Sequence, residues 1–299
     1  MTTGALPNSA PPSAAALGDG KHYLLLDGIA LEPLERWLYE HLDTPVYEPL
    51  YLHTPLEACR KLSPCLVALE PGSLVWERFL EQGAVESWGW LMASDASLEE
   101  LAAHLRWLLF VEHPLEGEKI LRLASAQVVH CLLEAEPEPS QSPLLGVIGA
   151  LWLPIAEDDG ITWRHLTNTQ GEPVRHRKRF RLQPAHLESL SRIAWQRFAG
   201  ELAQHLQAFF AHGPLISECG TAGMAARRVI DTTRELGFTG RRAHYYMANI
   251  LGAYGPAALD EQRMPDLARH VTQTSGTPME RLKAAATEAR RLASRESKA

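Results

Sequence analysis

The sequence has 299 residues, of which 45% are hydrophobic and 22% are charged. This composition excludes a disordered chain and is typical of a folded globular protein. At roughly 150 residues per domain, the length favours about two domains. The longest apolar run, Leu144–Leu153, is ten residues long, whereas a helix that crosses a bilayer needs about 20. We therefore expect no membrane span and no membrane partner.

Charge is distributed unevenly along the chain, whose net charge is −7. Residues 1–160 contain 8 Lys/Arg and 24 Asp/Glu, whereas residues 161–299 contain 21 and 12. The two parts therefore carry net charges of −16 and +9. Such asymmetry bears on association rather than on fold. It indicates either that the two parts attract each other or that one face binds a partner.

The first 20 residues contain no Lys or Arg and are rich in Ala, Pro, Ser and Gly. A secretory signal peptide needs a basic region followed by an apolar segment, so we predict a disordered tail over residues 1–20 instead. The four cysteines form no C-x-x-C pair and have no zinc-finger spacing. This cysteine usage suits a reducing compartment, and we predict a cytoplasmic protein.

Strand and helix patterns alternate over residues 21–170. Short apolar runs predict strands at Tyr23–Leu26, Cys65–Leu69 and Trp88–Met92. Helical patterns run from Leu31 to Leu42, from Ser73 towards Gly83 and from Ala126 to Leu133. Turn residues predict hairpins around Glu116-Gly117 and Asp158-Asp159-Gly160. Strands mixed with single helices indicate an α+β fold whose N-terminal lobe, residues 21–170, is a mixed α/β sheet domain.

The segment from Ser87 to Arg106 contains the clearest local signal. Ser97 and Glu100 have the S-x-x-E spacing of a capping box, in which the two side chains satisfy backbone N–H groups at a helix start. Leucines then recur at helical spacing, at Leu98, Leu101, Leu105 and Leu108. The segment therefore predicts a strand, a turn and a capped amphipathic helix.

The C-terminal part of the chain has a different pattern. Residues 171–183 contain a basic run, from which we predict a basic linker. Beyond Pro184 apolar residues recur at helical spacing, first from Leu187 to Phe209. Further helices are predicted at Ala222–Leu236, Arg241–Leu251 and Pro278–Ala293. Residues 184–299 are therefore predicted to form an all-helical bundle domain.

No recognised catalytic motif occurs in the sequence. There is no G-x-S-x-G nucleophile elbow, no G-x-x-x-x-G-K-[ST] phosphate loop, no H-E-x-x-H and no G-x-G-x-x-G. The His and Asp residues are scattered, and an unrecognised hydrolase would rest on these alone. We therefore predict that the protein is not an enzyme and has no catalytic residues, no cofactor and no metal site.

Two groups of residues are candidates for binding a partner. Trp88 and Trp90 lie two residues apart in a predicted strand, so their side chains are expected on one face. That face is either core or, if exposed, a contact surface, because Trp and Arg are typical interface anchors. The basic run is either a solvated linker, a docking patch for acidic surface or a nucleic-acid site.

Several sequence blocks resemble the adaptor, or effector-chaperone, family of bacterial type VI secretion systems. The most specific block is Ser87–Phe110, which contains W-G-W-L and S-D-A-S-L-E-E-L. Tyr23–Gly28 and Val46–Pro55, followed by Leu62–Val67, resemble the family's earlier blocks. The family usually continues with an R-F-Y-D-P-R-like string, where this chain has Arg122-Leu-Ala-Ser-Ala-Gln127. Glu235–Gly252 and Pro278–Leu282 resemble a helical module at the C-terminus of type VI-associated proteins.

The resemblance implies a non-enzymatic adaptor. Such a protein binds a type VI effector toxin in the cytoplasm and helps to load it onto the tip protein of the secretion spike. We nominate as partner-binding residues Trp88, Trp90, Asp95, Arg175, Arg177, Lys178 and Arg179. The alternative is a nucleic-acid-binding regulator that uses the basic C-terminal half, although no recognised DNA-binding motif supports it and nucleic acid is the less favoured partner.

Overall fold

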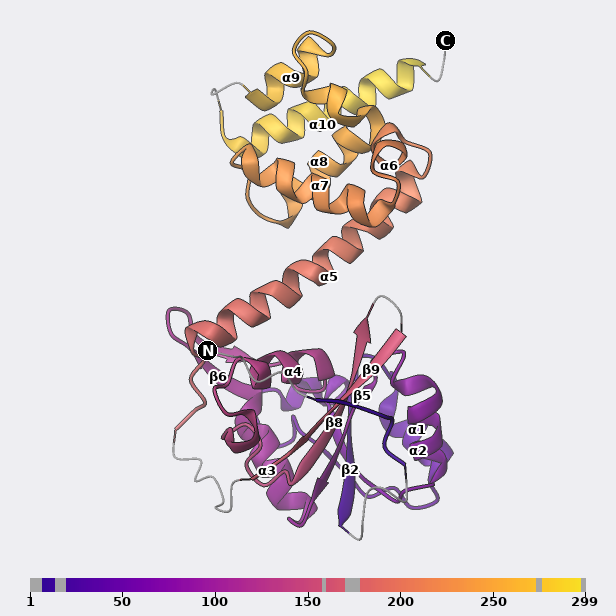
Figure 1. Cartoon of the computed structure of the whole chain (residues 1–299), viewed down its shortest axis with the longest axis vertical. Coiled ribbons are helices and arrows are strands. Elements are labelled where there is room, and N and C mark those ends of the chain that lie inside the picture. The colour runs from indigo at the N-terminus through magenta and orange to yellow at the C-terminus, as the bar shows by residue number, and fades with distance from the viewer. Residues whose placement is uncertain (1–6, 14–19, 158–159, 170–177, 273–275, 297–299) are drawn as a thin grey trace. The chain divides into compact units, whose positions relative to one another are not determined.

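The fold is described from a computed structural model that covers residues 7–13, 20–157, 160–169, 178–272 and 276–296 (Figure 1). The contacts divide the chain into two units, Met1–Ile193 and Ala194–Ala299. Each unit has a hydrophobic core of its own, and the two are described separately.

A seven-stranded sheet forms the centre of the first unit, with the strand order β1-β9-β8-β5-β2-β4-β3. All neighbouring strands are antiparallel. Leu24 of the interior strand β2 lies opposite Val67 of β4 on one side and Leu91 of β5 on the other. The strands are β1 (Asn8–Ser9), β2 (Lys21–Leu26), β3 (Tyr47–Pro49), β4 (Cys65–Leu69), β5 (Gly89–Ser94), β8 (Ala150–Glu157) and β9 (Gly160–Thr167).

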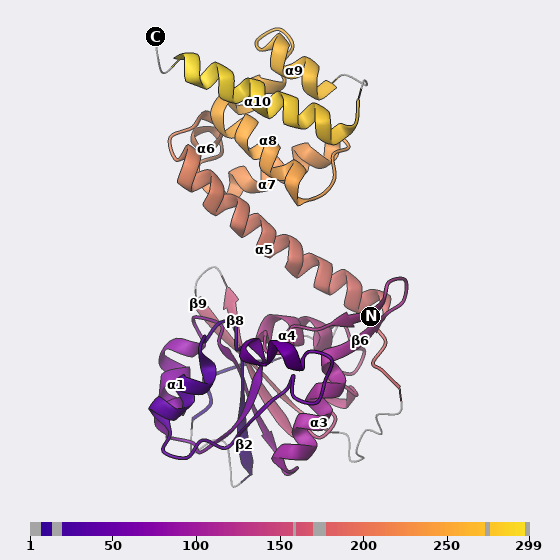
Figure 2. The ribbon, with the colours of Figure 1, turned by 180° about the vertical axis from the view of Figure 1, so that it is seen from behind.

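Helices cover both faces of this sheet, as the two opposite views show (Figures 1 and 2). Alternation along β2 sends Tyr23 and Leu25 into one core and Leu24 and Leu26 into the other. The first core is covered by α3 (Leu98–Leu109) and α4 (Ala126–Glu134). The second is covered by α1 (Leu34–His41), α2 (Leu74–Arg78) and the π-helical turn η3 (Phe79–Gly83).

The local signals read from the sequence are confirmed in this unit. The Ser97 hydroxyl accepts a hydrogen bond from the Glu100 N–H, and the Glu100 carboxylate accepts one from the Ser97 N–H. Ser73 caps α2 in the same way, through the Trp76 N–H. Both predicted hairpins form, β6 (Phe110–His113) with β7 (Gly117–Ile120) and β8 with β9. The predicted α+β fold is therefore correct for this lobe.

Residues 8 and 9 differ from the predicted disordered tail. They form β1 at the edge of the sheet, with Asn8 opposite Arg164 and Ser9 opposite Trp163. The next residues also contribute, since Pro12 is buried. A two-residue edge strand has no periodicity to detect, because its pairing depends on β9 at the other end of the unit's sequence.

Part of the predicted basic linker packs against the first unit. Residues 171–177 lie outside the described residues, but Phe180 and Leu182 are buried in the first core. The Glu112 N–H donates to the Phe180 carbonyl at 2.8 Å, and the Leu182 N–H donates to the Glu112 carbonyl at 2.9 Å. From residue 179 to residue 182, exposed basic residues therefore alternate with buried apolar residues.

The second unit is all-helical, as predicted. The long helix α5 (Pro184–Phe210) ends in it, and α7 (Ala222–Glu235), α8 (Arg241–Tyr254) and α10 (Pro278–Glu296) match predicted helices. Two short helices, α6 (Pro214–Cys219) and α9 (Pro265–Thr272), were not predicted. Leu202, Ala225, Met247 and Leu282 are among its fully buried core residues. Nowhere in the described residues is a helix long and apolar enough to cross a membrane.

Candidate partner-binding surface

The blocks that resemble the adaptor family meet at one end of β2. Here the chain leaves the strand at Asp27, whose N–H donates to the Trp88 carbonyl at 2.6 Å. The Asp27 side chain is 7% exposed, and its Oδ2 accepts hydrogen bonds from Nε and Nη2 of Arg122 at 3.0 and 2.9 Å. Its Oδ1 accepts the Ile29 N–H at 2.9 Å. Asp27 is therefore a buried carboxylate with both oxygens bonded, as a buried charge requires.

Gly28 is required by the close approach of a second block. A Cβ atom at this position would lie 2.3 Å from the Ser63 carbonyl oxygen. The Ser63 hydroxyl accepts the Tyr51 N–H at 2.9 Å and donates to the Pro64 carbonyl at 2.8 Å. The turn after β2 is thus fixed against the start of β4.

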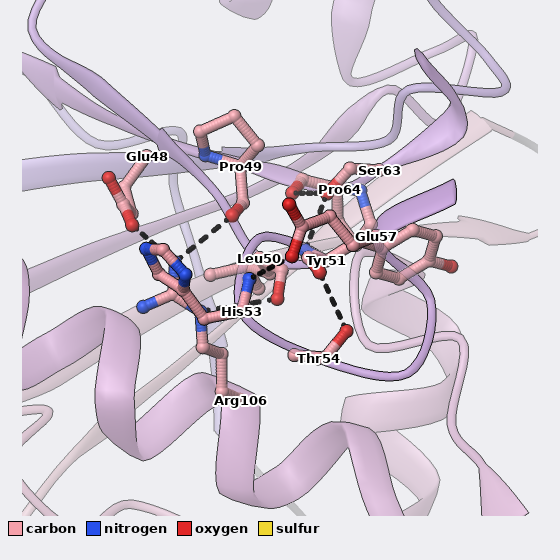
Figure 3. A network of polar contacts seen from close by, with 10 residues as sticks. All are labelled: Glu48, Pro49, Leu50, Tyr51, His53, Thr54, Glu57, Ser63, Pro64 and Arg106. Atoms are coloured by element: carbon pink, nitrogen blue, oxygen red, sulfur yellow. Dashed lines mark hydrogen bonds and ion pairs between the residues drawn. The ribbon is translucent and has the colours of Figure 1, made fainter. Parts of the chain in front are cut away.

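Arg106 holds the segment between β3 and the 3₁₀ helix η2 (Glu57–Leu62), as Figure 3 shows. From α3 it forms an ion pair with Glu48 and donates to the carbonyls of Pro49 and Leu50, at 3.1 and 3.2 Å. The loop then closes on itself, because the His53 N–H donates to Glu57 at 3.2 Å. Charge-assisted bonds of this kind restrain a loop more strongly than neutral ones.

Four side chains present a mixed surface beside the buried Asp27; we call Ile29, Tyr51, Leu62 and Arg122 the Arg122 surface. Ile29 is 55% exposed, Leu62 39%, and the Arg122 side chain 45%. Burial raises the pKa of the Tyr51 hydroxyl, and the nearby Asp27 carboxylate raises it further. Tyr51 is therefore a neutral hydrogen-bond donor at physiological pH. Arg and Tyr with apolar neighbours are the composition of interface hot spots.

The two buried cysteines of the first unit, Cys65 and Cys131, do not have the properties of nucleophiles. Burial raises the pKa of the Cys65 thiol to about 12, and burial also raises the pKa of Cys131. A thiol acts as a nucleophile only as the thiolate. Over the described residues, no three His, Cys, Asp or Glu side chains are grouped to hold a metal ion.

The two predicted tryptophan anchors lie in different cores instead of on one exposed face. Trp90, 1% exposed, enters the first core, where its Nε1 donates to the Leu123 carbonyl at 2.9 Å. Trp88, 5% exposed, enters the second core and packs edge-on against Trp37. The reason is that β5 begins at Gly89 and Ser87 has a positive φ of 59°, so Trp88 precedes the strand and does not follow its alternation. The expectation of a shared strand face was wrong.

The other nominated residues are dispersed. Asp95 is exposed in the turn after β5, where its carbonyl accepts from Lys21 at 3.3 Å. Arg175 and Arg177 lie outside the described residues. The Lys178 carbonyl accepts the Trp107 indole N–H at 2.7 Å, and Arg179 forms an ion pair with Glu118 of β7. The structure therefore does not bring Lys178 and Arg179 together with Asp95.

Sequence analysis missed the two arginines that organise the candidate surface. Arg106 lies on the predicted helix and Arg122 begins the string that departs from the family pattern. Arg122 matches the first Arg of the family's R-F-Y-D-P-R-like string, and its partner Asp27 lies in the block Tyr23–Gly28. The signal in the sequence was Asp27 directly after an apolar strand, because a carboxylate buried at such a strand end needs a charged partner.

Comparison with known proteins places the first unit in a family. Residues 22–142 match the family described as a domain of unknown function, DUF4123. The accessory protein VasW of Vibrio cholerae serotype O1 is 32% identical over 266 residues, which span 88% of this chain and 86% of the relative. No solved structure matches the chain.

The chain belongs to this DUF4123 family, the type VI secretion adaptor family that its sequence blocks resemble. The four blocks of the first unit lie within the matched residues and supply Asp27 and the Arg106 contacts. Arg122 also lies within the matched residues, in the string that departs from the family pattern.

Proposed function

We propose that this protein is a non-enzymatic adaptor of a type VI secretion system. It binds an effector toxin in the cytoplasm and helps to load it onto the tip protein of the secretion spike. The similarity to a relative named as an accessory protein supports a role beside the secretion apparatus. The first unit would contribute the Arg122 surface to the complex.

The observation that carries the proposal is the half-exposed Arg122 above the buried Asp27. Both bonds to Asp27 use one carboxylate oxygen, so the guanidinium is held in position while Nη1 is free of that pair. A pre-positioned Arg loses little conformational entropy when it binds a partner carboxylate or carbonyl. Exposed Ile29 and Leu62 supply apolar area beside it.

Co-expression with each toxin-domain protein encoded beside the gene tests this function. We expect one of them to be retained by the tagged adaptor and to become more soluble, because an adaptor covers apolar surface that the free toxin exposes. The expected interface buries roughly 1,200–2,000 Å² or more, as in stable complexes. If every such toxin is soluble alone and none is retained, the adaptor function is wrong.

Matched variants locate the site on the first unit. Ile29→Asp and Leu62→Asp, which leave the Asp27–Arg122 pair in place, should each reduce toxin retention. Arg36→Glu and Val85→Asp are the controls, since Arg36 and Val85 are also exposed, on α1 and after η3. Equal loss in test and control variants would place the binding site elsewhere.

The nucleic-acid alternative is an outcome of the same assay. This alternative depends on the basic run, part of which already forms ion pairs within the first unit. Arg179 pairs with Glu118, and Arg181 lies 3.8 Å from Glu112. Phosphate binding would have to compete with these glutamates. Salt-sensitive retention of DNA with no retained toxin would favour the regulator over the adaptor.

A further inference from the structure

A groove runs across the second unit between the end of α5, α8 and α10. Each helix contributes residues at helical spacing: His205 and Phe209 from α5, Tyr246 and Asn249 from α8, and Lys283, Ala286 and Arg290 from α10. All of these residues lie within the second unit. We call this the α10 groove.

The floor of the groove is apolar and closely packed. The Phe210 ring lies against Gly252, where a Cβ atom would come within 2.7 Å of it. His205 Nε2 and Asn249 Oδ1 are hydrogen-bonded at 2.8 Å, which satisfies the polar atoms at the α5–α8 junction. Ala286 and Ala293, both half-buried, form the α10 side of the groove, and Ala289 between them is 2% exposed. Small residues at this spacing let another backbone approach closely.

One large apolar side chain in the groove is mostly exposed. Phe209 is 70% exposed, although its ring lies 4.9 Å from that of His205. Leaving a phenylalanine in water forgoes the free energy that its burial against a partner would release. Phe209 has the position and size of an anchor for a partner.

The charge of the groove has one sign. Lys283 and Arg290 line it, and none of the described lining residues is acidic. Of the acidic residues of α10 beside these cations, Glu280 accepts a hydrogen bond from the Thr277 hydroxyl and Glu288 forms an ion pair with Arg291, and neither lines the groove. An apolar floor with two cations along one wall complements an apolar stripe flanked by carboxylates.

We infer that the α10 groove binds an acidic amphipathic helix of a partner protein. Its apolar residues at i, i+3 or i+4 and i+7 would contact Phe209, Ala286 and Ala293, and an Asp or Glu residue would pair with Lys283. The helix would belong to the effector, and this assignment rests on the proposed function. A helix fits better than nucleic acid, because phosphate chains are tracked by longer series of cations than the two present here.

Selection from a display library of random peptides of about 16 residues, roughly four helical turns, tests the groove without any effector. The immobilised full chain should enrich peptides that have carboxylates beside apolar residues at i, i+3 or i+4 and i+7. The double variant Phe209→Ala/Lys283→Glu should bind the enriched peptides at least about tenfold more weakly by fluorescence anisotropy. Both positions are exposed, so circular dichroism should show an unchanged fold.

The control is Met224→Ala/Arg227→Glu, which changes an exposed apolar residue and a cation of the same unit on α7. It should bind the peptides as the wild type does. Enrichment of no peptide, of peptides without the acidic amphipathic pattern, or equal binding by both double variants would overturn the inference. Competition by single-stranded DNA of about 20 nucleotides with no peptide enrichment would identify a nucleic-acid groove instead. If the full chain retains a toxin but enriches no peptide, the groove inference is wrong and the proposed adaptor function stands.

Discussion

Arg122 donates two hydrogen bonds to Oδ2 of Asp27, at 3.0 and 2.9 Å, across 95 residues of sequence. The pair joins the end of β2 to the segment between β7 and α4, where Leu123 also accepts the Trp90 indole N–H. A strand end, a loop and a core tryptophan are thereby fixed together. The rigidity of the Arg122 surface depends on this pair.

Removing Arg122 is predicted to destabilise the first unit. Arg122→Ala leaves the Asp27 carboxylate buried without its charged partner, which should lower the free energy of unfolding by about 1–3 kcal/mol. Tryptophan fluorescence in a urea titration follows this unit, because seven of the eight tryptophans lie before residue 194. The control Arg36→Ala breaks an exposed pair with Glu40 and should cost less than about 0.5 kcal/mol. Equal effects would mean that the Asp27–Arg122 pair is not structural.

A methyl group at position 28 is predicted to disrupt the candidate surface. Gly28→Ala would force the new Cβ against the Ser63 carbonyl, so that the turn after β2 must shift at a cost of about 1–3 kcal/mol or more. Gly20→Ala is the matched control, since the nearest atom to its Cβ would be 4.0 Å away. Urea unfolding and toxin retention should both fall for Gly28→Ala only. An unchanged unfolding midpoint would contradict the close approach.

Trp90 is predicted to act through stability and not as a contact residue. It is fully buried and hydrogen-bonded to Leu123, so Trp90→Ala should cost about 3–5 kcal/mol. Trp90→Phe keeps most of the volume and should cost less, while losing the indole bond. If Trp90→Phe abolishes toxin binding with little change in the unfolding midpoint, the residue has a binding role that its burial does not explain.

Short-range patterns predicted most elements correctly, and they failed where distant segments decide the structure. The Ser97–Glu100 box and both hairpins depend on residues within a few positions of each other. β1, the burial of Phe180 and the separate cores of Trp88 and Trp90 depend on pairing with remote strands. A period-2 pattern predicts a common face only inside a strand, and the start of β5 at Gly89 was not visible in the sequence.

The candidate surface was missed for the same reason. The family blocks were recognised one by one, but sequence does not show that Arg106 reaches Glu48 or that Arg122 reaches Asp27. These ion pairs join positions 58 and 95 residues apart. Counting charges over long segments gives net charges of −16 and +9 for the two parts of the chain. It does not show that Arg179 and Arg181 pair with Glu118 and Glu112 of the β6–β7 hairpin.

His244 provides a pH-dependent contribution to the stability of the second unit. It is 1% exposed; its Nδ1 lies 2.8 Å from the Gly240 carbonyl, and Nε2 has no hydrogen-bond partner among the described residues. Burial lowers the pKa of His244; the Gly240 bond opposes this shift, and Arg234 adds to the lowering. Protonation would place a second N–H in a site framed by Trp195 and Phe198, where no acceptor is described.

The sign of the pH effect follows from this lowered pKa. Between the folded pKa and the unfolded value of about 6.5, the unfolded chain binds more protons than the folded chain, so the free energy of unfolding falls as the pH drops through this window and levels off below it. Thermal unfolding by circular dichroism at about pH 7.5 and pH 5.5 should show a smaller drop for His244→Gln than for the wild type. His212→Gln, at an exposed position, should keep the wild-type drop. Burial also lowers the pKa of His130 and His165 in the first unit, and both are unchanged in all three proteins. An identical drop in His244→Gln and wild type would show that this histidine does not remain neutral in the fold.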